Sequence, residues 1–188
     1  MATQSQAGTT PLITDIQQVR QIRQFEDKPV PDDLVHTLLE VARWSGSSRN
    51  SQPWQFVVIT DKEELRKISE IRPPINWVAR APLAIAIVLD GENPGSEPFD
   101  EGRVTERLLI AARALGLGAG TAWFGDDAQE QRAKEVLGIP AERAAHSVVA
   151  IGYGTSAKDP RGARNNPGRK PLSDLVSYNR FGNRTPSS

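Results

Sequence analysis

The segment from Ser45 to Pro53 holds the densest group of polar side chains that could bind a ligand. It reads Ser-Gly-Ser-Ser-Arg-Asn-Ser-Gln-Pro and contains no core-forming side chain. A run of small residues exposes backbone N–H groups that can hold an anion or a polar ring. Ser47, Ser48 and Asn50 add side-chain donors. A capped helix end followed by a turn has the same composition, so the loop by itself leaves both interpretations open.

Arginines at separate positions in the chain suggest a second kind of chemistry. Arg20 and Arg23 are three residues apart, so on a helix they would share a face. The planar guanidinium group suits phosphate, because its donors are arranged as a fork. A basic tract between 161 and 170 includes Arg169. A solvated basic surface would show the same pattern in both places.

Composition excludes several classes of site. The chain has no Cys, which excludes thiol nucleophiles, disulfides and thiolate metal centres. Its two histidines, His36 and His146, leave little material for a metal centre or a catalytic triad. His36 and Glu40 are spaced as a two-ligand metal arm, but no third ligand is indicated, so a surface role is favoured. We therefore expect no metal centre and no thiol nucleophile.

Charge and hydropathy bear on partners and location. Among the 188 residues, 23 Lys and Arg balance 23 Asp and Glu, which argues against a general attraction to nucleic acid or anionic membranes. No apolar run approaches the roughly 18 residues of a membrane span. The N-terminal residues lack the basic and apolar regions of a secretory signal. We expect a cytoplasmic protein with no nucleic-acid or membrane partner.

The elements that must position these side chains alternate between helix and strand. A capping box at Thr14–Gln17 predicts the first helix, and Pro31 with two aspartates predicts the second. Periodicity then predicts strands at 56–59, 83–89, 119–124 and 147–153, and helices from 61, over 104–115 and over 128–137. Such alternation is typical of an α/β sandwich with few hairpins. Residues 116–120 are rich in Gly, but they follow a helix and precede a strand, the reverse of a dinucleotide-binding fingerprint.

Taken in order, four stretches resemble the FMN-dependent nitroreductase family. That family has an R-x-S-x-R-x-F pattern, a P-S-x-x-N-x-Q-P-W loop, a helix ending in G-L-G and a C-terminal R-x-P-L. Here they read V-R-Q-I-R-Q-F at 19–25, G-S-S-R-N-S-Q-P-W at 46–54, L-G-L-G at 115–118 and R-K-P-L at 169–172. The N-x-Q-P-W element is specific, and the likeness runs from about residue 14 to 181.

The resemblance implies an α+β sandwich with a central, mostly antiparallel sheet flanked by helices. It also implies a homodimer that exchanges C-terminal arms and binds FMN at the subunit interface. We expect a lead-in over residues 1–12 that is disordered, one flavin-binding domain over 13–182 and a flexible C-terminus over 183–188. Carried over by position, the cofactor-binding residues are Arg20, Gln21, Arg23, Ser47, Ser48, Asn50, Gln52, Ala119, Gly120, Thr121 and Arg169. Arg20, Arg23 and Arg169 would serve the phosphate and ring, and residues 119–121 would place N–H groups near the reactive edge of the flavin.

The chain departs from the family pattern at four positions. Val19 stands where the family often has its first Arg, and Gln21 stands where it has Ser. Gly46 replaces a Pro, and Glu106 lies where Gln is common. The changes at 19 and 21 bear on the phosphate pocket.

We therefore predict an enzyme that transfers a hydride from NADH or NADPH, through flavin N5, to a small acceptor by a ping-pong mechanism. Nitroaromatics, quinones and activated alkenes are the candidate acceptors. Because the flavin carries the chemistry, no side chain is expected to act as nucleophile. The alternatives are a flavin-storing or flavin-processing protein of the same fold with little turnover, and a relative that uses a deazaflavin.

Overall fold

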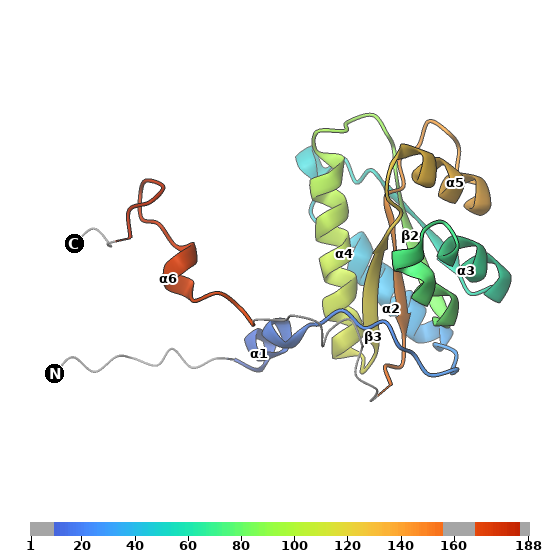
Figure 1. Cartoon of the computed structure of the whole chain (residues 1–188), viewed down its shortest axis with the longest axis horizontal. Helices are drawn as coiled ribbons and strands as arrows, with labels where there is room; N and C mark the ends of the chain where they lie inside the picture. The colour runs from blue at the N-terminus through green and yellow to red at the C-terminus, as the bar shows by residue number, and fades with distance from the viewer. Residues whose placement is uncertain (1–9, 156–167, 185–188) are drawn as a thin grey trace. The chain divides into compact units, whose positions relative to one another are not determined.

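A four-stranded sheet lies between two layers of helices (Figure 1). The computed structural model describes residues 10–155 and 168–184. Its strands are β1 (Trp54–Ile59), β2 (Leu83–Leu89), β3 (Gly118–Trp123) and β4 (Ser147–Gly152). They lie in the order β1-β2-β4-β3, and every neighbouring pair is antiparallel. Helical segments separate successive strands along the chain, so the expected α+β sandwich with few hairpins is confirmed.

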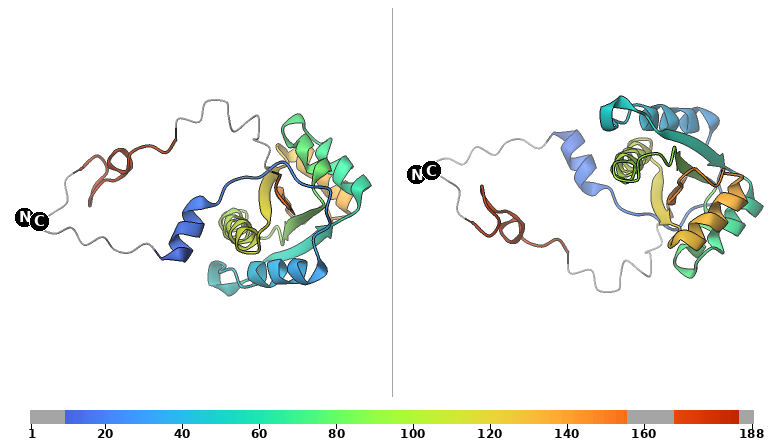
Figure 2. Two further views of the ribbon diagram at one scale, coloured as in Figure 1. Left: turned by 90° about the horizontal axis from the view of Figure 1, so that it is seen from below. Right: turned by 90° about the horizontal axis from the view of Figure 1, so that it is seen from above.

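The two faces of the sheet are covered by different helices (Figure 2). The helices α2 (Asp32–Arg43) and α4 (Glu97–Ala114) pack on one face. The helices α3 (Lys62–Ser69) and α5 (Asp127–Leu137) and the 3-10 segment η2 (Pro73–Arg80) pack on the other. Strand β2 is buried along its whole length, as its unbroken apolar sequence predicts. Its side chains alternate between the two cores, so the sheet is held from both sides.

Local capping signals explain where several helices begin and end. Asp61 accepts hydrogen bonds from two backbone N–H groups of α3, and Asp126 forms a capping box with Gln129 at the start of α5. Gly138 ends α5 in the left-handed region at φ 64°, which glycine adopts without steric cost. These three helix ends confirm the interpretation of the sequence.

Other boundaries correct the sequence prediction. The first helix, α1, spans Pro11–Gln18 and is capped by Thr10, so Thr14 lies inside it and opens no capping box. Helix α4 begins at Glu97, well before residue 104, because Pro98 is tolerated in a first turn. The Glu97 carboxylate accepts from the N–H groups of Gly91 (3.0 Å) and Asn93 (2.7 Å), which fixes the turn ahead of the helix. The segment η2 was not predicted.

The chain divides into two compact units, residues 1–157 and 158–188, which are described separately. The second unit contains the short helix α6 (Leu172–Leu175) within the expected C-terminal arm. The predicted domain limits of 13 and 182 stay a prediction, and most of the proposed lead-in lies outside the described residues. Within the described ranges, no helix is long and apolar enough to cross a membrane, and no cluster of three metal-ligating side chains occurs.

Candidate cofactor site

The segment that carries Arg20 and Arg23 runs beside edge strand β3. Gln21 forms a parallel bridge with Ala119, and the Ile22 N–H donates to the Ala119 carbonyl at 2.8 Å. Helix α1 ends at Gln18, so the two arginines lie on an extended segment and do not share a helical face, contrary to the sequence prediction. In extended chain, residues three apart point to opposite sides.

The two arginines make different contacts. Arg20 is exposed, and its Nη1 donates to the carbonyls of Gln17 and Val19, both at 2.7 Å. Arg23 is half-buried, and its guanidinium carbon lies 5.8 Å from the centre of the Trp77 ring. Arg20 therefore lies at the surface beside the end of α1, whereas Arg23 packs against the core below η2.

Glycine in β3 is what lets this segment approach so closely. A Cβ on Gly120 would lie 2.3 Å from the Ile22 carbonyl oxygen, and one on Gly118 would lie 2.8 Å from the Ile22 side chain. Either contact is far inside van der Waals distance. The Gly-rich turn thus serves a close backbone approach, but to the chain's own segment 21–22.

The Gln21 side chain is hydrogen-bonded to one of the backbone N–H groups that were expected to face the flavin. Its Oε1 accepts a hydrogen bond from the Thr121 N–H at 2.7 Å. The Thr121 hydroxyl is buried and has no hydrogen-bond partner in the described structure. The sequence resemblance pointed to both residues, but it gave no indication that they bind each other.

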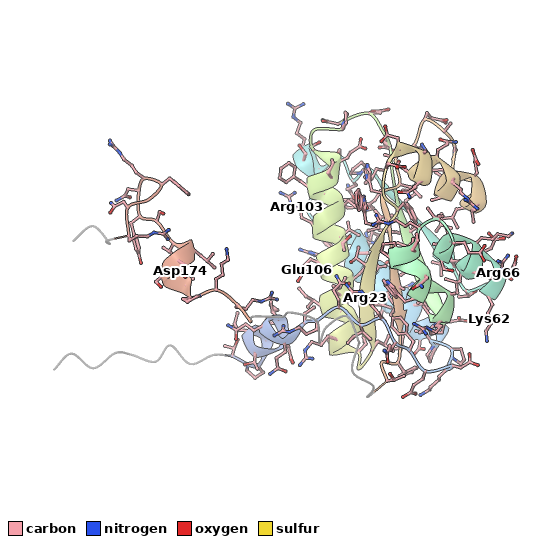
Figure 3. The ribbon with its side chains drawn as sticks, viewed as in Figure 1. Arg23, Lys62, Arg66, Arg103, Glu106 and Asp174 are labelled. Atoms are coloured by element: carbon pink, nitrogen blue, oxygen red, sulfur yellow. The ribbon has the colours of Figure 1, made fainter. Side chains whose placement is uncertain are left out.

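The polar loop 45–53 and Trp44, which precedes it, are held by side chains of α4. Buried Asp100 accepts from the Ser48 N–H at 3.1 Å, and Arg103, labelled on α4 in Figure 3, donates to the Gly46 carbonyl at 3.3 Å. Arg107 donates to the Trp44 carbonyl at 2.7 Å. These three α4 side chains fix the loop from outside, and the sequence analysis identified none of them.

Inside the loop the backbone is strained. Arg49, Asn50 and Gln52 have φ values of 53°, 57° and 51°, in the left-handed region that non-glycine residues rarely adopt. The Ser47 hydroxyl accepts from the Gln52 N–H at 2.9 Å, which stabilises the turn. Strain of this type persists where the surroundings enforce it and is concentrated at ligand sites. A plain capped helix end would not need it.

A cavity of about 350 Å³ lies where the Arg20 segment meets the end of α4 and the start of β3. It is lined by Gln18, Val19, Arg20, Ile22, Leu109, Arg113, Gly116, Leu117, Gly118, Ala119, Gly154 and Thr155. A larger cavity of about 650 Å³, near Asp27, Lys62 and Arg80, contains none of the predicted site residues. The smaller cavity is the one that joins the predicted elements.

Within one chain, the predicted site residues fall into two groups that lie apart. Ser48 is bound to Asp100, whereas Arg20 shares the cavity with Arg113. Thirteen residues of α4 separate Asp100 from Arg113, which is about 20 Å at a rise of about 1.5 Å per residue. Strands β1 and β3, which adjoin the two groups, are also opposite edges of the sheet. A single chain does not bring the loop to the cavity.

Arg169 belongs to the second compact unit, so its position relative to the cavity is not described. It is exposed and precedes α6. The basic residues at 161 and 164 lie outside the described residues. Convergence of Arg169 with Arg20 stays a prediction.

A buried polar network ties α4 to the start of β4. The carboxylate of Glu101 accepts from the Ser147 hydroxyl at 2.7 Å and lies 2.6 Å from His146 Nδ1. This hydrogen bond raises the pKa of His146, as does the nearby charge of Glu130 on α5, although partial burial opposes the shift. None of these side chains lines the cavity. The network is therefore a structural link between α4, α5 and β4.

The chain is similar in sequence to known proteins. The Nitroreductase family model matches residues 16–90. A protein of Archaeoglobus fulgidus, provisionally named NADH dehydrogenase/NAD(P)H nitroreductase, is 36% identical over 148 residues, which cover 74% of this chain and 83% of the relative.

Solved structures show the same architecture. An FMN-dependent nitroreductase from Clostridium difficile R20291 matches with a TM-score of 0.78 and 25% identity, covering 90% of this chain and 99% of that one. A provisionally named nitroreductase from Desulfovibrio desulfuricans, solved in complex with FMN, matches with a TM-score of 0.72 and 28% identity, covering 90% and 96%. The antiparallel sheet between two helical layers is thus shared with proteins of known structure.

Proposed function

Because the chain belongs to the nitroreductase family, we propose that it is an FMN-dependent oxidoreductase that uses NADH or NADPH. It would pass a hydride to a small acceptor, such as a nitroaromatic, a quinone or an activated alkene, in two half-reactions of a ping-pong mechanism. The bound flavin supplies the hydride chemistry, so the protein's task is to bind, orient and tune it.

The observation that carries this proposal is the cavity between the Arg20 segment, β3 and α4. Its wall combines two guanidinium groups, Arg20 and Arg113, with apolar side chains and glycine backbone. The lining has no acidic residue, and a cavity with two cationic side chains fits the phosphate end of a flavin nucleotide.

Each predicted residue has a defined task in this proposal. Arg20 would bind the phosphate, and Arg23 would lie toward the ring. The loop residues Ser47, Ser48, Asn50 and Gln52 would donate to the ribityl chain and the ring edge. Backbone N–H groups of residues 119–121 would stabilise charge that develops on the ring during reduction. The Thr121 N–H becomes available only when the Gln21 side chain turns away from it.

We further propose that the cofactor site is completed by a second copy of the chain. Ser48 is bound to Asp100, and the cavity residue Arg113 lies about 20 Å further along α4, so in this proposal the loop comes from one copy and the cavity from the other. Trp44 and Phe99 are 70% and 74% exposed beside the loop and the first turn of α4. Large exposed aromatic side chains are typical of protein interfaces.

Spectroscopy of the purified protein tests the function directly. We expect a yellow protein whose flavin absorbance bleaches anaerobically on addition of NADH or NADPH and returns when an acceptor is added. A protein that takes up FMN but is bleached by neither nucleotide would favour the storage interpretation. If FMN neither binds nor raises Tm, the proposed function is wrong.

A mixed dimer tests the shared site. One variant carries Ser47→Ala and Asn50→Ala in the loop, and the other carries Arg20→Ala and Arg23→Ala beside the cavity. If the site is shared, each variant alone binds FMN weakly, whereas a co-purified heterodimer has one intact site and binds one flavin tightly. If each chain builds its own site, the heterodimer holds two damaged sites and recovers nothing.

A further inference from the structure

Val19 and Arg113 line the same cavity and belong to different elements. Val19 follows the end of α1, and Arg113 lies in the last turn of α4, close in space but 94 residues apart in sequence. The valine stands at a position where the sequence pattern of the family has an arginine. The cavity therefore has an apolar side chain at the expected cation position and a second cation, Arg113, that the sequence did not predict.

The hydrogen bonds of Arg113 leave part of its guanidinium group unused. Its Nη2 contacts Asp15 Oδ1, at 3.3 Å, and the Gln18 side-chain oxygen, and both partners belong to α1. Its Nε is buried and has no hydrogen-bond partner in the part of the chain that the structure describes. The Arg113 side chain as a whole is 35% exposed and lines the cavity, so its guanidinium group can meet an acceptor there.

Charge around the cavity points to an anion. The lining contains Arg20 and Arg113 and has no acidic residue. Asp15 pairs with Arg113, but its side chain is 55% exposed, so water screens much of its charge. Two guanidinium groups and one exposed carboxylate leave a net positive cavity. A phosphate monoester, with up to two negative charges and several acceptor oxygens, matches it.

We propose that Arg113 is a phosphate ligand of this chain and supplies the cation that Val19 does not. The proposal rests on the proposed function, and it assigns the bound phosphate to FMN. Asp15 and Gln18 hold Nη2 and so fix the guanidinium group, whose positive charge and remaining donors serve a phosphate in the cavity. Arg20, which also lines the cavity, provides the second positive charge. NADPH also carries a phosphate monoester, its 2′-phosphate, so the experiment must distinguish binding of FMN from binding of NADPH.

The test compares FMN with riboflavin, which differs only in lacking the phosphate. We expect Arg113→Gln to weaken FMN binding to the flavin-free protein by about tenfold to a hundredfold, the range for loss of a charge-assisted hydrogen bond. Riboflavin affinity should not change, and the loss of FMN affinity should shrink as salt screens the charge. Arg66→Gln is the matched control, because Arg66 is also held by carboxylates of a helix but lies on α3, away from the cavity (Figure 3).

A rescue variant distinguishes loss of the charge from a folding defect in Arg113→Gln. Val19→Arg in the Arg113→Gln background returns a cation to the same cavity and should recover much of the FMN affinity. Equal affinity of Arg113→Gln and wild type for FMN would overturn the proposal. An equal loss for FMN and riboflavin would also overturn it, because the effect would not concern the phosphate.

Two further outcomes separate this proposal from others. If Arg113→Gln raises the KM for NADPH but leaves that for NADH and the affinity for FMN unchanged, the cavity serves the nicotinamide nucleotide and the assignment to FMN is wrong. If the wild type binds neither FMN nor riboflavin, the proposed function itself fails. If Arg113→Gln loses affinity for FMN alone and the wild type keeps it, the result supports both the role of Arg113 and the proposed function.

Discussion

Asp100 offers a direct test of how the polar loop is held. Its side chain is 2% exposed, and its two oxygens accept from the Ser48 N–H at 3.1 Å and from Arg103 Nη1 at 3.0 Å. Arg103 in turn donates to the Gly46 carbonyl. Asp100→Ala removes both acceptors, which frees the Ser48 N–H and the guanidinium group together.

The two contacts differ in strength because their partners differ in exposure. A hydrogen bond to a buried charged group contributes about 1.5–3 kcal/mol. The Arg103 side chain is 55% exposed, so its ion pair contributes about 0–1 kcal/mol. We therefore expect Asp100→Ala to lower the free energy of unfolding by about 2–4 kcal/mol. Asp100→Asn, which keeps an oxygen for the Ser48 N–H, should lose less.

Urea unfolding of the flavin-free protein measures this difference, and Glu106→Ala is the control on an exposed position of the same helix (Figure 3). FMN affinity should fall as well, because Ser48 and its neighbours would no longer be held in place. If Asp100→Ala unfolds at the same urea concentration as Glu106→Ala, Asp100 does not anchor the loop. The explanation of the loop's strained backbone would then also be wrong.

Two further predictions concern the β3 approach and the buried network. Gly120→Ala places a Cβ 2.3 Å from the Ile22 carbonyl, so it should destabilise the protein by about 1–3 kcal/mol in a thermal melt. Gly46→Ala, whose Cβ meets nothing within 4 Å, should not, and equal Tm values for the two would refute the steric argument. The hydrogen bond to Glu101 raises the pKa of His146, so its stabilising effect is complete below about pH 6.5 and is lost as pH rises through the raised pKa. His146→Gln should therefore destabilise the protein more at pH 6 than at pH 9, and an equal loss at both would contradict this reasoning.

Much of the architecture could be predicted because it depends on local chemistry. The apolar run of β2 requires cover on both faces, and Asp61, Asp126 and Gly138 mark helix ends through contacts within a few residues. The order of four short motifs pointed to the nitroreductase family and so to an antiparallel sheet. The start of α4 was misjudged because Glu97 is stabilised by a turn that the periodicity of the helix does not reveal.

The sequence by itself narrowed the kind of chemistry: without cysteine and with two histidines it left no thiol chemistry and little material for a triad or metal centre, and the motifs indicated a flavin. Only the tertiary structure decided which side chains meet. The pairings of Ser48 with Asp100 and of Arg113 with the Val19 cavity join residues more than fifty positions apart. Such contacts depend on how helices pack on the sheet, and no local propensity encodes them. The same packing ties Ser48 to the start of α4 and places the cavity at its end, which is why the proposed cofactor site takes residues from two chains.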